Sequence, residues 1–184
     1  MSLKYALLGF LNYGTMTGYE LKQRFDHSVQ HFWNANLSQI YPTLSQMEKE
    51  GLLVMEVEYQ ESRPNRKVYK ITDTGRQELK RWLGEPMDLA PVRIPFLIKV
   101  FFGANIESER VAELIRHQIK LHREKLDEYM EISSFICEAA QSPEIKRDAQ
   151  YWQLSLKAGI RFETAFLEWL EEAINTIEEM DSKK

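Results

Sequence analysis

The sequence is organised around one stretch, Asn36–Gly51, NLSQIYPTLSQMEKEG. Its apolar side chains recur at steps of three and four residues: Leu37, Ile40, Tyr41, Leu44 and Met47. This spacing predicts a helix with one buried face. Asn36 or Ser38 can cap its start, and Gly51 is expected where the helix ends. Pro42 is expected in or just after the first turn, the part of a helix that tolerates proline.

The side of this helix opposite the apolar stripe carries mostly uncharged hydrogen-bonding groups. They are Ser38, Gln39, Thr43, Ser45 and Gln46, together with Lys49. A solvated helix face usually carries a mixture of Glu and Lys instead. Hydroxyl and amide side chains suit contacts with base edges and phosphates. A merely solvated face is the alternative, so the interpretation depends on the neighbouring segments.

Two short helices are predicted before this stretch. Residues 2–12 place apolar side chains on one side of the first helix. Residues 13–16 form a tight break. Thr17 and Glu20 then match the S/T-x-x-E capping box, which opens a second helix running to about Ser28. Together with the central stretch, this pattern predicts a helix-turn-helix.

A period-two pattern follows, which predicts a half-buried strand. The side chains expected to face inward are those of Leu53, Met55, Val57 and Tyr59. Residues 61–66 form a turn and residues 67–71 the returning strand. Such a hairpin after a helix-turn-helix is called a wing. Thr72 or Thr74 is expected to start a further helix that ends at Gly84. The polar and basic residues at the wing tip are Arg63, Asn65, Arg66 and Lys67.

Residues 85–95, EPMDLAPVRIP, contain three prolines and mark a domain boundary. We therefore predict a winged helix-turn-helix domain over residues 1–84, a linker over 85–95 and a helical domain over 96–184. The fold class is mainly α with a small β-wing.

Helices are predicted in the C-terminal domain over residues 96–103, 107–140 and 144–179, with Pro143 at the first helical position of the last one. Both long helices carry an apolar stripe at near-heptad intervals. The two long helices are not expected to bury all the apolar surface of these stripes against each other and the short helix alone. This domain is therefore predicted to be a dimerisation domain.

The 184-residue chain has a net charge of −4, which taken alone argues against nucleic acid. The charge is unevenly distributed. Residues 1–84 contain eleven basic and nine acidic side chains, and residues 62–81 contain seven basic and two acidic ones. A local basic patch of this kind is what phosphate binding needs.

The remaining composition indicates a cytoplasmic protein. No apolar run reaches the length of ~18 residues that reads as a bilayer-spanning helix, and no signal peptide is recognisable. The single Cys137 fits a reducing compartment, where it is expected to be buried or incidental. No membrane partner is expected.

Enzyme motifs are missing from the sequence. It has no phosphate-binding Gly-rich loop, no dinucleotide fingerprint and no H-E-x-x-H zinc motif. His27 and His31 stand four residues apart, but no third ligand accompanies them. We predict neither catalysis, nor a metal, nor a cofactor.

Aromatic residues of the C-terminal domain suggest a second kind of function. Phe96, Phe101, Phe102, Trp152 and Phe162 are candidates to line a pocket for an aromatic or lipophilic effector. The alternative is that these side chains belong to the core. The corresponding functional hypothesis is a small-molecule sensing module whose DNA binding is weak or secondary.

Three blocks of sequence resemble the PadR-like transcriptional regulators. They are ALLGFLNYGTMTGYELKQRFD (6–26), FWNANLSQIYPTLSQMEKEGL (32–52) and RPNRKVYKITDTGRQELKRWL (63–83). The C-terminal FETAFLEWLEEAI (162–174) is similar to the longer helical domain of the subfamily related to virulence activators. The proline that follows the first tight turn in relatives is Met16 here.

The resemblance implies a homodimer, acting as repressor or activator, that places two winged helices in successive major grooves of a pseudopalindromic operator. It also implies release by a small molecule in some members. By motif position, Gln39, Tyr41 and Pro42 fall in the recognition-helix block of the family. Arg63, Asn65, Arg66 and Lys67 fall in its wing block.

These roles give a hypothesis for contacts with double-stranded DNA. The side chains expected in the major groove are Ser38, Gln39, Thr43, Ser45 and Lys49. Gln39 is suited to pair with adenine through its amide. Tyr19 and Tyr41 are expected to reach phosphates, with core burial as the alternative for Tyr41. Arg66 or Lys67 is expected on phosphate or in the minor groove.

Overall fold

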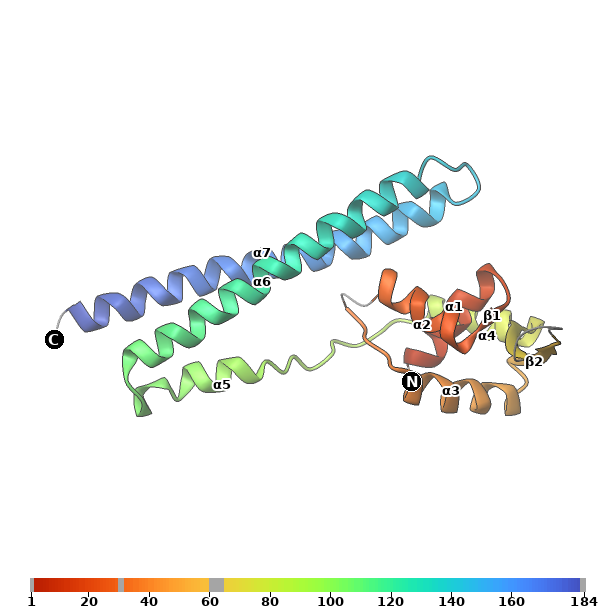
Figure 1. The fold of residues 1–184 in the computed structure, drawn as a ribbon, viewed down its shortest axis with the longest axis horizontal. Helices are drawn as coiled ribbons and strands as arrows, with labels where there is room; N and C mark the ends of the chain where they lie inside the picture. The colour runs from red at the N-terminus through yellow and green to blue at the C-terminus, as the bar shows by residue number, and fades with distance from the viewer. Residues whose placement is uncertain (1, 30–31, 60–64, 183–184) are drawn as a thin grey trace. The chain divides into compact units, whose positions relative to one another are not determined.

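The computed structural model describes residues 2–29, 32–59 and 65–182 (Figure 1). The chain divides into two compact units, Met1–Leu89 and Ala90–Lys184. The division falls within the segment 85–95, where the prolines lie. Each unit is described on its own.

The N-terminal unit contains four helices and three strands within its described residues. They are α1 (Ser2–Tyr13), β1 (Met16–Thr17), α2 (Gly18–His27), α3 (Leu37–Lys49), β2 (Leu53–Glu58), β3 (Arg66–Ile71) and α4 (Asp73–Gly84). The predicted helices and hairpin are present. Three of the helices are capped by side chains expected from the sequence: Thr17 caps α2, Asn36 caps α3 and Thr72 caps α4.

The three strands form an antiparallel sheet in the order β1-β3-β2. β1 was predicted only as a break, yet Met16 pairs with Tyr69 and Thr17 with Val68. A two-residue strand leaves no periodicity to detect. Its pairing partner lies about fifty residues away in the sequence, which a local pattern cannot reveal.

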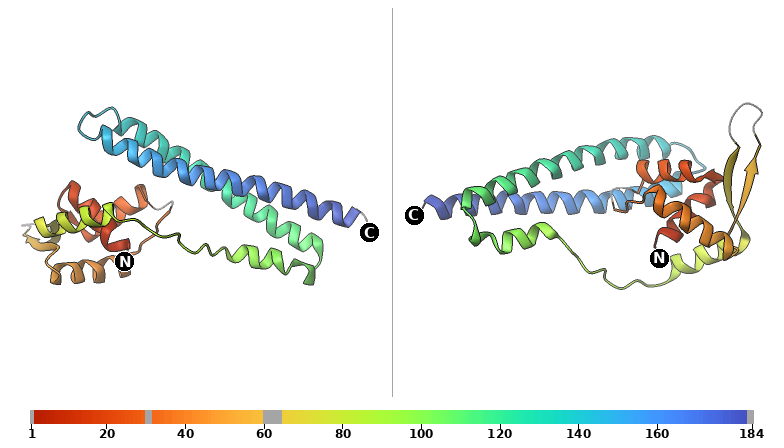
Figure 2. Two further views of the ribbon diagram at one scale, coloured as in Figure 1. Left: turned by 180° about the vertical axis from the view of Figure 1, so that it is seen from behind. Right: turned by 60° about the horizontal axis from the view of Figure 1, so that its bottom comes forward.

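The outer half of the wing extends beyond the core, as Figure 2 shows. Leu53 is buried and Met55 is half-buried, as predicted. The prediction that Val57 and Tyr59 face inward is wrong, because Tyr59 is 84% exposed. The alternation of apolar and polar residues along β2 continues past the point where helices cover the sheet. The sequence pattern is therefore the same in the covered and in the uncovered part of the strand.

A single hydrophobic core holds the N-terminal unit together, with every helix and all three strands contributing. Its most deeply buried side chains include Leu7, Leu8, Leu11, Leu21, Phe25, Ile40, Leu44, Met47 and Leu53. The helix α3 lies on this core through Ile40, Leu44 and Met47, three of the residues that defined its apolar stripe. Pro42 lies inside α3, in the second turn, and its ring is exposed.

The backbone makes a close junction where α3, β2 and α4 meet. Gly51 has a φ of +72°, which glycine adopts without steric cost. The Thr72 N–H donates to the Leu52 carbonyl (3.0 Å), and Thr72 Oγ1 donates to the Gly51 carbonyl (2.7 Å). A Cβ atom on Gly75 would lie 2.1 Å from Leu52 O. Only glycine lets the start of α4 approach so closely.

A network of polar side chains joins α1 to α4. Tyr5 stacks on Trp82 with ring centroids 4.4 Å apart, and the Tyr5 hydroxyl donates to Glu78 Oε1 (2.8 Å). Arg81 donates to both oxygens of Glu78. The Arg81 bonds, followed by the Tyr5 bond, lower the pKa of Glu78 to about 2. Lys4 connects this network to Glu50, the C-cap of α3 (3.2 Å).

All the regular secondary structure in the described residues of the C-terminal unit is helical. It contains α5 (Pro95–Phe101), the short 3-10 helix η1 (Gly103–Asn105), α6 (Ser108–Ala139) and α7 (Lys146–Ser182). α6 and α7 lie side by side along their lengths (Figures 1 and 2). The prediction that Pro143 occupies the first helical position is wrong, because α7 begins three residues later. The predicted fold class is confirmed.

The apolar stripes of α6 and α7 largely cover each other within one chain. The fully buried members include Ile115, Tyr129, Leu156 and Leu170. Several stripe residues stay half-buried, among them Leu126, Ile132 and Ile174, so the dimerisation domain remains a prediction. The large hydrophobic side chains left exposed on the two helices are Leu121, Met130, Phe135, Tyr151, Leu154, Phe162 and Met180.

A polar pair interrupts this apolar contact near the middle of the two helices. His122 Nδ1 on α6 is hydrogen-bonded to a carboxylate oxygen of Glu163 on α7, and both side chains are largely buried. Phe166 packs against the His122 ring (4.7 Å between centroids). Burial, with a further contribution from Glu163, raises the pKa of Tyr129 to about 12.

Replacing Gly75 with alanine should destabilise the N-terminal unit. The added methyl group would push α4 off the Leu52 carbonyl, at a cost of about 1–3 kcal/mol for overpacking. Urea unfolding followed by circular dichroism would measure the change in the free energy of unfolding. Gly84→Ala is the matched control, because no atom lies within 4 Å of its added Cβ. Equal stability of the two variants would contradict the close junction.

Candidate nucleic-acid interface

The exposed side of α3 follows from its buried side. Because Ile40, Leu44 and Met47 point into the core, the polar residues predicted for the opposite face point outward. The exposed residues are Ser38, Gln39, Tyr41, Ser45 and Lys49, with Thr43 half-buried.

Residues at the start of α3 already bind each other. The Gln39 N–H donates to Asn36 Oδ1 (3.1 Å), and the Asn36 N–H donates to Gln39 Oε1 (3.1 Å). Ser38 Oγ also donates to Asn36 Oδ1 (2.5 Å). A two-bond contact with adenine needs the oxygen and the nitrogen of the Gln39 amide. In this structure that oxygen serves the cap, so the side chain has two competing roles.

Ser45 and Lys49 form the part of this face without an internal partner. Thr43, by contrast, donates its hydroxyl to the Gln39 carbonyl (2.7 Å). Within residues 2–29, 32–59 and 65–182, no hydrogen bond or ion pair occupies the Ser45 hydroxyl or the Lys49 ammonium group. The two side chains are four residues apart and therefore neighbours on the helix surface. They are available to an external ligand.

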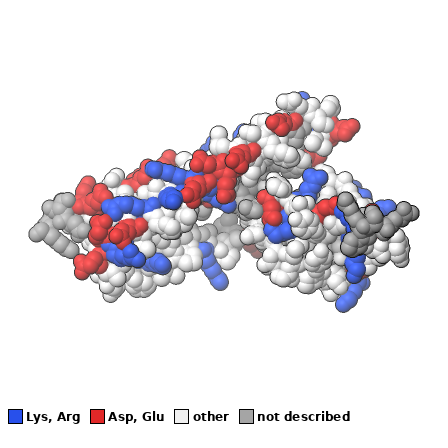
Figure 3. Space-filling view, in the orientation of Figure 1, with Lys and Arg blue, Asp and Glu red and all other residues white. Residues whose placement is uncertain are grey.

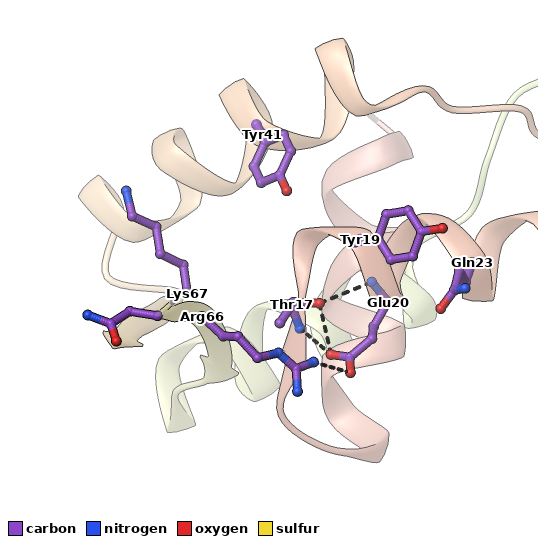
Figure 4. Close-up of a pocket in the computed structure, with 8 residues that line it drawn as sticks. Thr17, Tyr19, Glu20, Gln23, Tyr41, Arg66 and Lys67 are labelled. Atoms are coloured by element: carbon purple, nitrogen blue, oxygen red, sulfur yellow. Dashed lines mark hydrogen bonds and ion pairs between the residues drawn. The ribbon is translucent and has the colours of Figure 1, made fainter. Parts of the chain in front are cut away.

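The two basic residues at the start of β3 point in different directions (Figure 4). Arg66 reaches toward α2, where its Nη2 lies 2.7 Å from Glu20 Oε1. Lys67 reaches toward α3, as expected for the next residue of a strand. Among the described residues, no partner binds the Lys67 ammonium group. Arg63, the other predicted wing cation, lies outside the described residues.

An open groove of about 520 Å³ lies between α2, α3 and the outer end of the wing, where β3 begins. It brings together five predicted contact residues, Tyr19, Tyr41, Asn65, Arg66 and Lys67, from three separate segments. Its other lining residues, Thr17, Glu20 and Gln23, were not predicted as contact residues. Thr17 and Glu20 had been recognised as a helix cap, but no sequence signal connects them to the wing.

Glu20 is held at the start of α2 by several donors. Its Oε2 accepts from the Thr17 N–H (2.7 Å) and the Thr17 hydroxyl (2.9 Å), while its Oε1 accepts from Arg66. The Thr17 backbone bond is the largest cause of a lowered pKa for Glu20, followed by the Thr17 hydroxyl and Arg66 among the favourable contacts. The carboxylate is therefore ionised and fixed in place.

Tyr41 depends on a glycine for its position. A Cβ atom on Gly18 would lie 2.5 Å from Tyr41 Cε1 and 2.8 Å from Cζ. The ring lies over the first residue of α2 and is 46% exposed. Of the two predicted environments for Tyr41, the exposed one is observed. Tyr19, in the same groove, is also exposed.

The five aromatic residues proposed as an effector pocket do not form one cluster within the described chain. Phe96 packs against the Ile115–Leu170 core, and Trp152 packs against the Tyr129–Leu156 core. Phe101, Phe102 and Phe162 are exposed. Phe101 and Phe102 contact each other edge to face at 4.9 Å. Their role as a pocket remains a prediction.

The predictions for the single cysteine, for a metal site and for a membrane-spanning helix can also be compared with the structure. Cys137 is exposed, so of the two alternatives for this thiol, buried or incidental, the buried one is not observed. The described residues contain no cluster of three or more potential metal-binding side chains, and His31 lies outside them. None of the described helices is long and apolar enough to cross a membrane.

Basic side chains project from the visible face of the N-terminal unit beside a few acidic ones, and basic and acidic side chains are closely interspersed on the C-terminal unit (Figure 3). Ion pairs such as Arg116–Glu109 and Arg123–Glu171 account for part of that mixture. The described residues thus form a winged helix, in which Lys49 and Lys67 have no internal partner, and a long helical hairpin; a winged helix with such cations is typical of DNA-binding regulators.

Comparisons with known proteins identify the family. Residues 7–81 match the Transcriptional regulator PadR-like family, and residues 92–178 match the Virulence activator alpha C-term family. The Probable transcriptional regulator Rv1176c of Mycobacterium tuberculosis is 34% identical over 194 residues, covering 97% of this chain and 99% of the relative. The chain belongs to the PadR-like family, as its sequence blocks predicted. The prediction that it is not an enzyme is confirmed by this membership.

Solved structures of relatives share the fold. The Negative transcriptional regulator PadR of Bacillus subtilis is 28% identical over 177 residues, covering 96% of this chain and 97% of the relative. Its structure in complex with operator DNA has a TM-score of 0.82 at 29% identity, covering 96% of this chain and 99% of that one. The same protein was solved in complex with p-coumaric acid, with a TM-score of 0.73 at 27% identity, covering 96% and 95%.

Gly18→Ala should displace the Tyr41 ring without unfolding the protein. The ring can move into solvent, and alanine favours the helix, so the net change in stability should stay within about 1 kcal/mol. The ring resonances of Tyr41 in an NMR spectrum should shift. In Gly14→Ala, where the added Cβ meets nothing within 4 Å, they should not. Unchanged Tyr41 resonances in Gly18→Ala would contradict this packing.

Proposed function

We propose that this protein is a sequence-specific transcriptional regulator that binds double-stranded DNA as a homodimer and acts as a repressor. One observation carries the proposal: the open groove between α2, Tyr41 of α3 and the start of β3, whose lining includes Lys67. Among the described residues neither Lys67 nor Lys49, which is exposed on α3, has a partner for its ammonium group. The operator complex of the Bacillus subtilis relative supports a DNA ligand. The description of that relative as a negative regulator supports repression.

The exposed face of α3 and the groove beside the wing have different proposed tasks. Ser45, Gln39 and Ser38 read base edges in the major groove, and Thr43 contributes its hydroxyl oxygen as an acceptor. Lys49 and Lys67 bind phosphates, because both ammonium groups lack an internal partner among the described residues. Tyr19 and Tyr41 donate their hydroxyls to the DNA backbone from within the groove.

A homodimer supplies the second half of the contact. The exposed apolar side chains of α6 and α7, including Met130, Phe135 and Phe162, support burial against a second copy of the chain. One winged helix neutralises few phosphates, whereas two related by symmetry bind a pseudopalindromic operator. Half-sites separated by about one helical turn, ~34 Å, follow from this arrangement.

A second candidate function is the binding of a small aromatic effector by the C-terminal unit. The p-coumaric acid complex of the Bacillus subtilis relative supports this function. The exposed rings of Phe101, Phe102 and Phe162 supply apolar faces that an aromatic acid can stack on. Binding of the effector would release the DNA.

Lys67→Ala and Lys49→Ala should each weaken binding to duplex DNA of any sequence, including the promoter upstream of the protein's own gene. Each should reduce the slope of log affinity against log salt by about 0.9 for every phosphate that the variant no longer neutralises. Ser45→Ala should relax preference at one base position instead. Fluorescence anisotropy over a salt series would measure these slopes.

Lys120→Ala is the control for charge, since Lys120 is exposed in the C-terminal unit. Its slope should equal that of the unmodified protein. Equal slopes for all three lysine variants would contradict the proposed interface. A protein that sediments as a 21.8 kDa monomer at DNA-binding concentrations would contradict the homodimer.

p-Coumaric acid should raise the melting temperature of the protein. At ten times its dissociation constant a ligand stabilises the folded state by about 1.4 kcal/mol, which corresponds to roughly 3–6 °C for a chain of this size. Differential scanning fluorimetry would detect this shift, and Phe162→Leu should reduce it. No shift at millimolar concentration would contradict this effector class.

A further inference from the structure

An ion pair that the proposed function does not use connects the described wing to α2. The β1–β3 ladder ends at Thr17 and Val68. Two residues further along the wing, Arg66 Nη2 binds Glu20 Oε1 at 2.7 Å, joining positions 46 residues apart in the sequence. The wing is thus tied to α2 where its regular pairing with β1 has stopped.

The surroundings of the Glu20 carboxylate are those of a bound anion. It receives the Thr17 N–H, the Thr17 hydroxyl and the Arg66 guanidinium, all at the N-terminal end of α2 (Figure 4). Guanidinium, hydroxyl and backbone N–H groups are also the donors that proteins use for DNA phosphates. Arg66 therefore already holds an anion, supplied by its own chain, inside the groove proposed to face the duplex.

Lys67 provides the contrast on the same strand. Its ammonium group points toward α3 and meets no partner among the described residues, whereas Arg66 is half of a neutral pair. A cation that approaches a phosphate unpaired releases a counterion from the DNA. A cation that remains paired with a carboxylate releases none, so only unpaired cations steepen the salt dependence of binding.

We propose that Glu20 is an internal counter-ion for Arg66 and limits the attraction of the wing to DNA of any sequence, which makes Glu20 a specificity-determining residue. The inference rests on the proposed DNA binding and refines it. Of the two cations at the start of β3, Lys67 supplies the salt-dependent contact. The ion pair with Glu20 keeps Arg66 from binding phosphate. Binding then depends more on base contacts, so the operator is preferred over unrelated duplex.

Glu20→Gln tests the proposal while keeping the helix cap, because glutamine can replace glutamate in a capping box. Removal of the negative charge should release Arg66 to a phosphate. The salt slope should steepen by about 0.9 per protomer, or ~1.8 for a dimer. Between 50 and 200 mM salt the affinity of the dimer should then fall about twelvefold more than that of the unmodified protein. Affinity for unrelated duplex should rise more than affinity for the operator.

Glu58→Gln is the matched control. Glu58 lies opposite Arg66 in the β2–β3 ladder, and its substitution removes the same charge. Among the described residues it forms no ion pair, so the slope of this variant should change little. The double variant Glu20→Gln/Arg66→Ala should return to the original slope, because the added phosphate contact requires Arg66. Melting temperatures of Glu20→Gln and Glu58→Gln should agree within a few degrees.

Two results would overturn the proposal. A slope for Glu20→Gln equal to that of Glu58→Gln would mean that the carboxylate does not withhold Arg66. Weaker duplex binding by Glu20→Gln would mean that the carboxylate positions Arg66 for DNA instead. If Glu20→Gln does not fold, Arg66→Ala tests the inference instead. Arg66→Ala should keep the original salt slope, whereas Lys67→Ala should flatten it. Equal flattening of the slope by both variants would refute the inference.

A measurement without DNA separates this inference from the proposed function. On a heparin column, Glu20→Gln should elute at higher salt than Glu58→Gln, although the two variants have the same net charge. Equal elution would overturn the role of Glu20. The unmodified protein could fail to bind any duplex while the two variants still separate on heparin. That result would refute the proposed DNA binding but would support Glu20 as the counter-ion of Arg66.

Discussion

The close approach of Gly75 to the Leu52 carbonyl is the constraint on which the rest of the N-terminal unit depends. At this point the end of α3, the start of β2 and the start of α4 share a few backbone groups. The exposed polar face of α3 and the wing are consequently built on a common base. The network of Glu78 attaches α1 to the same assembly, through Tyr5 to α4 and through Lys4 to the end of α3.

Local sequence patterns predicted the elements of this fold well, because the helices carry an apolar periodicity and α2, α3 and α4 also carry N-terminal caps. They failed where a distant segment decides the outcome. The pairing of β1 with β3 and the ion pair of Glu20 with Arg66 both join positions about fifty residues apart. Tyr59 followed the expected alternation, yet the core does not extend far enough to cover it.

The candidate site was predicted in composition but not in its internal bonding. Ser45 and Lys49 have the open positions expected of contact residues. Gln39, expected to read a base, also closes the cap of α3, and Arg66, expected on phosphate, binds a carboxylate. Sequence reasoning assigns each residue one role, whereas folding gives some polar groups a first partner before any ligand arrives.

The polar pair between α6 and α7 constrains how the two long helices align. An apolar stripe alone permits one helix to shift along the other by a turn, because apolar side chains still meet apolar side chains in the shifted alignment. Such a slip would separate Glu163 from His122 and leave a carboxylate facing Tyr129 and aliphatic side chains. Breaking a buried pair in this way costs about 3–5 kcal/mol, so the hairpin has one favoured registration.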